Sequence, residues 1–277
     1  MDYPEPDFDR LPAINGVGVP EVTAAELTPE LVRAGILRDG CLLIRGLMDS
    51  EQALRLAGEI EQATEARRAL GSGAGASEGY YEEFDPGPEI DLYEQRKWVT
   101  DGGLWAVDSP KLMFETFDAF ERSGLRDVIQ GYLAETPAIS VQKCTMRKVE
   151  PDSASAWHQD GAFLGSVRAL NVWLSLSRCG DLAPGLDIVP KRLTEIVPTG
   201  TEGAIFNWSV APDVVEGVAA PEGVVRPIFE PGDVLLFDEM NLHSTAAEPT
   251  MPNPRYAVES WFFGLSGFPA DYVPIAY

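Results

Sequence analysis

The spacing of apolar residues changes near Ala138, and this change restricts the possible folds more than any other feature of the chain. Before it, helical spacing dominates, as in PELVRAGILRDG, which we expect to end as a helix near Gly40. A second predicted helix begins at an N-cap formed by Asp49 or Ser50, and a third helical region covers Ser109 to Leu133. After Ala138 the chain consists of short β-branched and aromatic runs separated by Pro/Gly-rich turns.

Several short segments have the composition of strands. An early one is CLLIRGL, and the later ones are 138–149, 167–177, 185–190, 223–229, 233–238, 243–247 and 255–264. Helices followed by many short strands are typical of an α+β, mainly β fold, in which a helical layer packs on an antiparallel barrel or jelly roll.

The expected domain organisation is simple. A chain of 277 residues is long enough for one domain of this class, and helices that cover the sheet favour a single unit over two. We expect an extended arm (1–20), a mainly helical part with the first strand (21–137), a jelly-roll core (138–265) and a C-terminal tail (266–277).

The net charge of -23 excludes whole classes of partner. Such a surface repels nucleic-acid backbones and anionic membranes, and it argues mildly against a highly anionic substrate. The three cysteines form neither a disulfide framework nor a CxxC site, and no segment resembles a secretory signal or a membrane span. We therefore expect a reduced, cytoplasmic protein that binds a small molecule; its oligomeric state is not indicated.

The chain has only two histidines, and both lie in the strand-rich part. His158 stands two residues before Asp160 in WHQDGAF, and His243 follows later in FDEMNLHSTAA. Residues two apart in an extended segment point the same way, so His158 and Asp160 could bind one ion. Two imidazoles and one carboxylate suit a non-haem Fe(II) site. The alternative is a pair of hydrogen-bonded core histidines.

Further polar residues fall on strands expected near this site. Arg255 begins the strand after the one that holds His243, where its guanidinium could clamp a dicarboxylate, and Thr245 shares the face of His243. In RALNVWLSLS, Asn171 and Trp173 alternate with leucine and valine, so they are expected on the cavity side. Arg255 could equally be a surface residue, and Trp173 a core residue.

The order of HxD, a VWLSL strand, a distal histidine and an arginine resembles the phytanoyl-CoA dioxygenase family of Fe(II)/2-oxoglutarate oxygenases. The opening DGCLLIRGLMDSEQALRLAGEIE is also similar to that family, so the resemblance covers about 35–264. It implies a double-stranded β-helix (a cupin-like jelly roll) with helices packed on one sheet. It also implies Fe(II) as cofactor, and 2-oxoglutarate and O2 as co-substrates.

The resemblance also implies roles for individual residues. His158, Asp160 and His243 match the metal ligands, and Arg255 matches the residue that pairs with the distal carboxylate of 2-oxoglutarate. Other positions match the co-substrate pocket or the strand before the motif, and these are Thr245, Trp173, Gln142 and Lys143.

The implied reaction converts 2-oxoglutarate and O2 to succinate and CO2 while oxidising, most simply hydroxylating, a C–H bond of a metabolite. Halogenation is disfavoured because Asp160 keeps the carboxylate ligand. The substrate side departs from the family at APGLDIVPKRL, where many relatives have an asparagine-glycine turn and a closing histidine. Candidates for the substrate wall are the aromatic residues Tyr80, Tyr81, Trp98, Trp105 and Phe163, together with Asn171. The glycine-rich segment 71–79 is interpreted as a loop or lid.

Three other interpretations stay open at this point. Two histidines and an aspartate also suit a zinc-dependent hydrolase, although the sequence shows no well-placed general base and leaves Arg255 unexplained. A metal-free binding protein of the same fold, or a purely structural role for both histidines, would also fit the motif.

Overall fold

The computed structural model describes residues 2–14, 18–73, 79–87, 96, 99, 102–153, 156–165 and 167–277. Its large sheet runs in the order β1 (Glu21–Thr23), β2 (Cys41–Arg45), β7 (Val234–Phe237), β5 (Ala169–Ser175), β9 (Arg255–Gly264), β4 (Pro137–Val149) and β10 (Pro274–Ala276), and β3 (Gly103–Trp105) also pairs with β4. A small sheet consists of β6 (Gly185–Ile188) and β8 (His243–Ala246). Apart from the parallel pair β1–β2, the paired strands of both sheets are antiparallel.

The small sheet covers one face of the large sheet and completes a jelly roll. Leu186 and Ile188 of β6 pack in one buried cluster with Trp173, Phe237 and Trp261 of the large sheet. Isolated bridges, such as the one between Ile188 and Val225, extend the small layer beyond its two strands. The double-stranded β-helix expected from the resemblance is confirmed.

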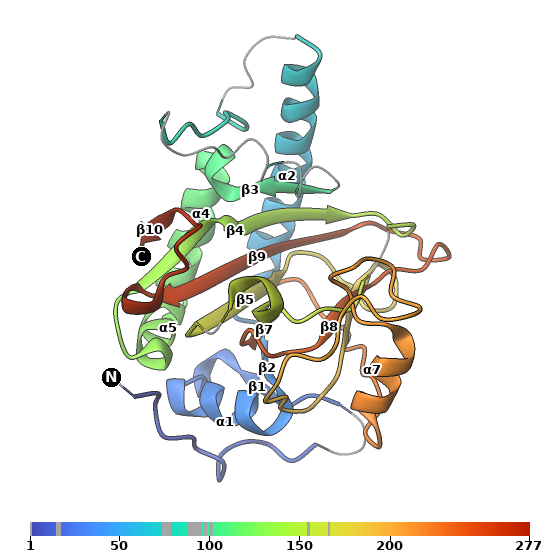
Figure 1. Cartoon of the computed structure of the whole chain (residues 1–277). Coiled ribbons are helices and arrows are strands. Elements are labelled where there is room, and N and C mark those ends of the chain that lie inside the picture. The colour runs from blue at the N-terminus through green and yellow to red at the C-terminus, as the bar shows by residue number, and fades with distance from the viewer. Residues whose placement is uncertain are drawn as a thin grey trace.

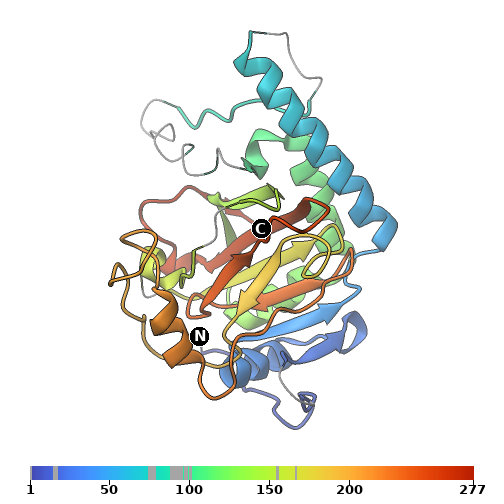
Figure 2. The same ribbon diagram turned by 90° about the vertical axis from the view of Figure 1, so that its right-hand side faces the viewer.

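Helices cover the other face of the large sheet. They are α1 (Pro29–Asp39), α2 (Ser50–Gly71), α4 (Pro110–Arg122) and α5 (Leu125–Leu133), and short 3-10 turns lie at η1 (Ala24–Glu26), η3 (Ala106–Asp108) and η4 (Leu265–Gly267). In Figure 1, α4 and α5 lie on one side of β4 and β9, whereas α7 (Pro212–Ala219) lies beyond β8 on the other. Figure 2 shows α2 crossing the sheet on the helical side.

Side-chain alternation explains how the sheet carries two different layers. Leu170, Val172 and Leu174 of β5 join the buried cluster that includes the helices, whereas Trp173 joins the cluster between the two sheets. The predicted division of this strand into two faces is therefore confirmed.

Local signals place the helix ends where the sequence predicts them. The Asp49 carboxylate accepts hydrogen bonds from the backbone N–H groups of Glu51 and Gln52 at the start of α2. Gly40 ends α1 with φ of 78°, a left-handed conformation that glycine adopts without strain. Gly124, with φ of 74°, separates α4 from α5 within the predicted region Ser109 to Leu133.

One predicted strand is wrong. Within 223–229, only Val225 and Phe229 form isolated bridges, because Pro227 between them has no N–H to donate to a ladder. The sequence interpretation also missed α6 (Gly161–Leu164), α7 and the short strands β1, β3 and β10. The C-terminal tail therefore includes a strand, β10, which pairs with β4.

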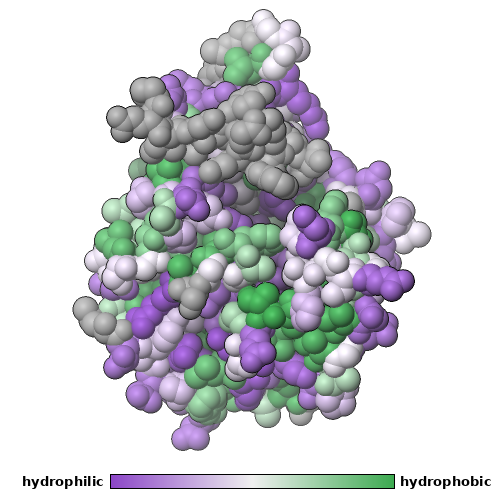
Figure 3. All heavy atoms as spheres, viewed as in Figure 1, coloured by the Kyte–Doolittle hydropathy of each residue, from purple (hydrophilic) through white to green (hydrophobic). Residues whose placement is uncertain are grey.

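Within the described part of the chain, no helix combines the length and apolar composition that a membrane span requires. Figure 3 shows hydrophilic residues spread over one face of the molecule with smaller apolar patches between them.

Candidate metal centre and its cavity

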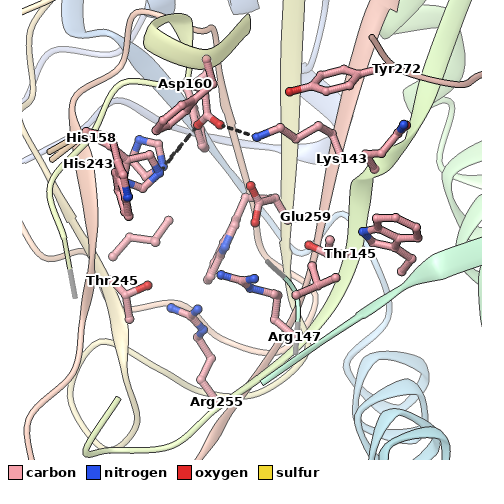
Figure 4. Close-up of a pocket in the computed structure, with 18 residues that line it drawn as sticks. Lys143, Thr145, Arg147, His158, Asp160, His243, Thr245, Arg255, Glu259 and Tyr272 are labelled. Atoms are coloured by element: carbon pink, nitrogen blue, oxygen red, sulfur yellow. Dashed lines mark hydrogen bonds and ion pairs between the residues drawn. The ribbon is translucent and has the colours of Figure 1, made fainter. Parts of the chain in front are cut away.

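The two histidines and Asp160 meet between the two layers. His158 and His243 form a backbone bridge, with N–O distances of 3.0 and 3.1 Å in the two directions. The Asp160 Oδ2 atom lies 3.9 Å from Nε2 of His158 and 3.8 Å from Nε2 of His243. One ligand atom from each residue falls within 4.8 Å of the others. The three side chains can therefore hold a single metal ion (Figure 4).

Both imidazole rings are oriented by backbone carbonyl groups. Nδ1 of His158 lies 2.9 Å from the carbonyl oxygen of Ala156, and Nδ1 of His243 lies 3.2 Å from that of Asn241. A carbonyl oxygen only accepts, so each Nδ1 carries the proton and each Nε2 keeps a lone pair for a metal. Burial, followed by the nearby His158, lowers the pKa of His243 to about 4. His243 is thus neutral near pH 7, as a metal ligand must be.

The two oxygens of the Asp160 carboxylate face different groups, one a lysine and the other the two imidazoles. The residue is 3% exposed, and its Oδ1 atom lies 3.4 Å from Nζ of Lys143. Oδ2, which faces both imidazoles, has no hydrogen-bond partner among the described residues. Burial opposes ionisation, yet the charge of Lys143 is the largest effect that holds the pKa of Asp160 below its usual value. A buried, ionised oxygen without a donor fits a cation, and two imidazoles with one carboxylate suit Fe(II).

Gln159, in the middle of WHQDGAF, holds this loop in place. Its side-chain amide donates to the carbonyl oxygens of Glu195 and Met240 and accepts a hydrogen bond from the N–H of Val197. The N–H of Gly161 donates to the carbonyl oxygen of Glu239 at 2.8 Å. A Cβ at Gly161 would lie 3.0 Å from that same oxygen, so glycine allows this close approach.

Arg255 is a buried cation. It is 2% exposed, and its Nη1 donates to the carbonyl oxygen of Gly185 at 2.8 Å. Nε has no partner, and the guanidinium forms no ion pair with any described residue. Burial lowers the pKa of Arg255 to about 10. An uncompensated buried guanidinium fits an anionic group of a ligand.

One cavity of about 490 Å³ joins the metal position and Arg255. The residues predicted from the sequence that line it are His158, Asp160, His243, Arg255, Thr245, Trp173, Gln142, Lys143, Phe163 and Trp105. The structure thus brings together the proposed ligands, the arginine and most of the secondary candidates (Figure 4).

Three predicted wall residues lie elsewhere. Asn171 is fully buried on the inner face, where Phe237 and Trp261 are its partners on the neighbouring strands. The Tyr80 ring packs under the ammonium of Lys111, 4.6 Å away, and Tyr81 belongs to the cluster under the helices. These residues carry no signal that separates a core position from a wall position. Trp98 and most of the segment 71–79 lie outside the described residues.

Several cavity residues were missed by sequence reasoning. They are Val99, Thr145, Arg147, Leu186, Trp208, Phe237, Glu259 and Tyr272. Alternation could have revealed some of them, because Thr145 and Arg147 continue the face of Lys143 on β4, and Glu259 continues the face of Arg255 on β9. Tyr272 and Trp208 come from loops, for which no periodicity exists.

Aromatic side chains border the cavity beside the metal position. The Trp208 ring stacks on Phe206 at 5.0 Å and contacts Phe163 edge-on at 5.6 Å. The His158 ring lies 5.9 Å from Trp208. Because Phe163 is 44% exposed, this aromatic group lies between the metal position and solvent.

Comparison with solved structures supports the architecture. EctD from S. alaskensis, with 2-oxoglutarate and 5-hydroxyectoine, superposes with a TM-score of 0.59 at 16% identity, covering 84% of this chain and 75% of that one. The non-heme alpha ketoglutarate dependent carbocyclase SnoK from nogalamycin biosynthesis gives 0.57 at 15% identity, covering 88% and 87%. The epimerase SnoN, in complex with Fe3+, alpha ketoglutarate and nogalamycin RO, gives 0.53 at 18% identity, covering 85% and 83%.

No family model and no curated protein sequence matches the chain. At these identities the structural likeness establishes a shared fold, the jelly roll with its helical layer.

Proposed function

We propose that this chain is a non-haem Fe(II)/2-oxoglutarate-dependent oxygenase of the phytanoyl-CoA dioxygenase type that oxidises a C–H bond of a small molecule. One observation carries the proposal: a single cavity has a His-Asp-His triad at one end and an unpaired, buried guanidinium at the other. A ligand that chelates a metal through one end and presents a carboxylate at the other would satisfy both. 2-Oxoglutarate is such a ligand.

In this proposal Arg255 binds the distal carboxylate of 2-oxoglutarate, and the carbonyl oxygen of Gly185 fixes the plane of its guanidinium. Thr245 lines the same part of the cavity and can donate its hydroxyl to that carboxylate. Trp173, 5.4 Å below the guanidinium, keeps water away from the charge pair, which strengthens it.

The other lining residues orient the metal ligands and exclude water. Lys143 holds Asp160 Oδ1 and leaves Oδ2 for the metal, while the backbone carbonyl groups fix both imidazoles. When bound, Fe(II) with 2-oxoglutarate supplies the activation of O2 and the oxidation of a C–H bond. Phe163 and Trp208 shield that bond from solvent.

The structural neighbours support this class, since they include proteins with bound 2-oxoglutarate or alpha ketoglutarate and an alpha ketoglutarate dependent carbocyclase. They also include a carbocyclase and an epimerase, so we propose hydroxylation as the simplest outcome for this chain. The single domain over 1–277 and the cytoplasmic location rest on the sequence and stay predictions.

The test is anaerobic addition of Fe(II) and 2-oxoglutarate to the purified protein. We expect a visible metal-to-ligand charge-transfer band that disappears in His158→Ala and in Asp160→Ala. Succinate formation in air should be lost by at least about a hundredfold in the same variants, because each removes one of three ligands.

The zinc hydrolase alternative requires a separate comparison. Glu259 lines the cavity and could act as a general base, so the lack of a base no longer argues against a hydrolase. The buried guanidinium of Arg255, which forms no ion pair with a described residue, still argues against a hydrolase. Tight zinc binding without a band would favour the hydrolase, and normal 2-oxoglutarate binding by Arg255→Ala would disprove the role given to that arginine.

A further inference from the structure

Four residues on neighbouring strands pair in a row along the wall of the cavity. Trp105 of β3 pairs with Thr145 of β4, Thr145 pairs with Glu259 of β9, and Glu259 pairs with Trp173 of β5. All four side chains line the cavity. The register of four strands therefore places one carboxylate and one hydroxyl between two indoles.

The carboxylate and the hydroxyl of this row have no hydrogen-bond partner in the part of the chain that the structure describes. Thr145 is 5% exposed, and its Oγ1 atom forms no hydrogen bond with the residues that the structure describes. The partly buried carboxylate of Glu259 forms neither a hydrogen bond nor an ion pair with any described residue. A carboxylate that has lost part of its hydration without gaining a donor is costly unless a ligand supplies one.

Two of the three cationic side chains that line the cavity have a partner other than Glu259. Lys143 contacts Asp160, and Arg255 contacts the carbonyl oxygen of Gly185 at the 2-oxoglutarate end. Arg147 lines the cavity but forms no ion pair with Glu259. In Figure 4, Asp160 and Lys143 lie on one side of the Glu259 carboxylate and Arg147 lies on the other. The carboxylate points into the space between them.

We propose that the substrate carries a protonated amine, or another cationic nitrogen group, and that Glu259 is the residue that binds it. The inference rests on the proposed function, which assigns Arg255 to the co-substrate and leaves Glu259 for the substrate. Thr145 accepts a second N–H of the same group, and the indoles of Trp105 and Trp173 border it. The net charge of -23 also favours approach of a cationic molecule.

The test uses matched ligands, each series comprising an amine, an alcohol and a carboxylate on one carbon skeleton (benzyl, cyclohexyl and butyl). Binding to the anaerobic protein with Fe(II) and 2-oxoglutarate is measured by calorimetry. We expect the amine to bind about tenfold more tightly than the alcohol, as one charge-assisted hydrogen bond would give. An amine that binds no better than the alcohol or carboxylate, or no binding at all, would overturn the proposal.

Variants assign the preference to Glu259. Glu259→Gln should lose it, and Glu259→Asp, which keeps the charge, should retain part of it. Glu202→Gln is the matched control, because Glu202 is exposed and lies outside the cavity lining. If Glu259→Gln keeps the full preference for amines while still binding 2-oxoglutarate, Glu259 is not the recognition residue.

The charge-transfer band separates this proposal from the proposed function. A wild-type protein with the band but no amine preference would retain the oxygenase assignment and reject the substrate class. A protein without the band that still prefers amines through Glu259 would reject the oxygenase and keep the cation site.

Discussion

The two faces of the large sheet differ in whether the polar atoms of their buried strand residues have hydrogen-bond partners. On the helical face, strand residues such as Val172, Val258 and Phe262 pack in an apolar cluster. On the cavity face, the buried side chains of Thr145, Asn171, Arg255 and Trp261 each hold a polar atom that has no hydrogen-bond partner among the described residues.

This difference indicates that the helical face serves mainly stability and the cavity face mainly ligand binding. Apolar burial on the helical face stabilises the fold, whereas unpaired polar groups on the cavity face destabilise the ligand-free protein. Such groups are retained where a ligand satisfies them. Substitutions on the two faces should therefore change stability in opposite directions.

The largest effect is expected on the helical face. Phe262 is fully buried, with its ring 6.5 Å from Phe120 and 5.1 Å from Tyr277. Phe262→Ala should lower the free energy of unfolding by about 3–5 kcal/mol through lost burial and a cavity. Urea denaturation measures this. Leu54→Ala is the control, because Leu54 is 54% exposed and its loss should change stability by less than about 0.5 kcal/mol.

On the cavity face, Arg255→Met should raise the unfolding free energy of the ligand-free protein by about 1 kcal/mol, since it removes an unpaired buried charge at similar volume. The same variant should no longer be stabilised by 2-oxoglutarate in the presence of metal. Arg122→Met, at an arginine whose side chain is 72% exposed, is the control and should do neither. A large loss of stability in Arg255→Met would remove the contrast between the faces.

An effect of similar size but opposite sign tests the helical layer itself. Asp49→Ala removes the N-cap of α2 and should cost about 1 kcal/mol, because two backbone N–H groups lose their acceptor. Gln62→Ala, at an exposed position in the same helix, should be neutral or slightly stabilising. Equal effects of the two substitutions in thermal denaturation would contradict the capping role.

The smallest effect concerns the reactivity of the three thiols, which lie on both sides of the large sheet. Burial raises the pKa of Cys144, on the helical face, to about 12 and that of Cys179, on the cavity side, to about 11; it also raises that of Cys41. Since the thiolate is the reactive form, native protein at pH 8 should not react with a thiol reagent, and unfolded protein should react at all three. Rapid reaction of Cys179 alone would show that the cavity side is open.

Much of the fold could be predicted because its signals are local. Asp49 and Gly40 mark helix ends, and the alternation around Trp173 separates two faces, without knowledge of distant residues. The predicted strand over 223–229 failed for a reason also present in the sequence, since Pro227 cannot donate to a ladder.

The site was predictable in part. His158, Asp160 and His243 could be grouped because they are rare residues in a known order, and the structure places them within reach of one ion. Tyr80 and Tyr81 could not be distinguished from core residues, because aromatic residues occur both in hydrophobic cores and in cavity walls, and the residue type alone does not tell which.

By itself, the sequence determined the helix ends and the alternation of strand faces, since each depends on neighbours a few positions away. It also named the residues able to bind a metal, because the chain has only two histidines and they stand in a known order with Asp160. Only the tertiary structure decided that Glu259 and Thr145 share a row between Trp105 and Trp173. The alternation within one strand gives the face of each residue but not its partner on the next strand, which also depends on packing and on irregularities such as the shift between Ile139 and Cys144 in β4. The metal ligands could therefore be named from the sequence, whereas the residue proposed to select the substrate required the fold.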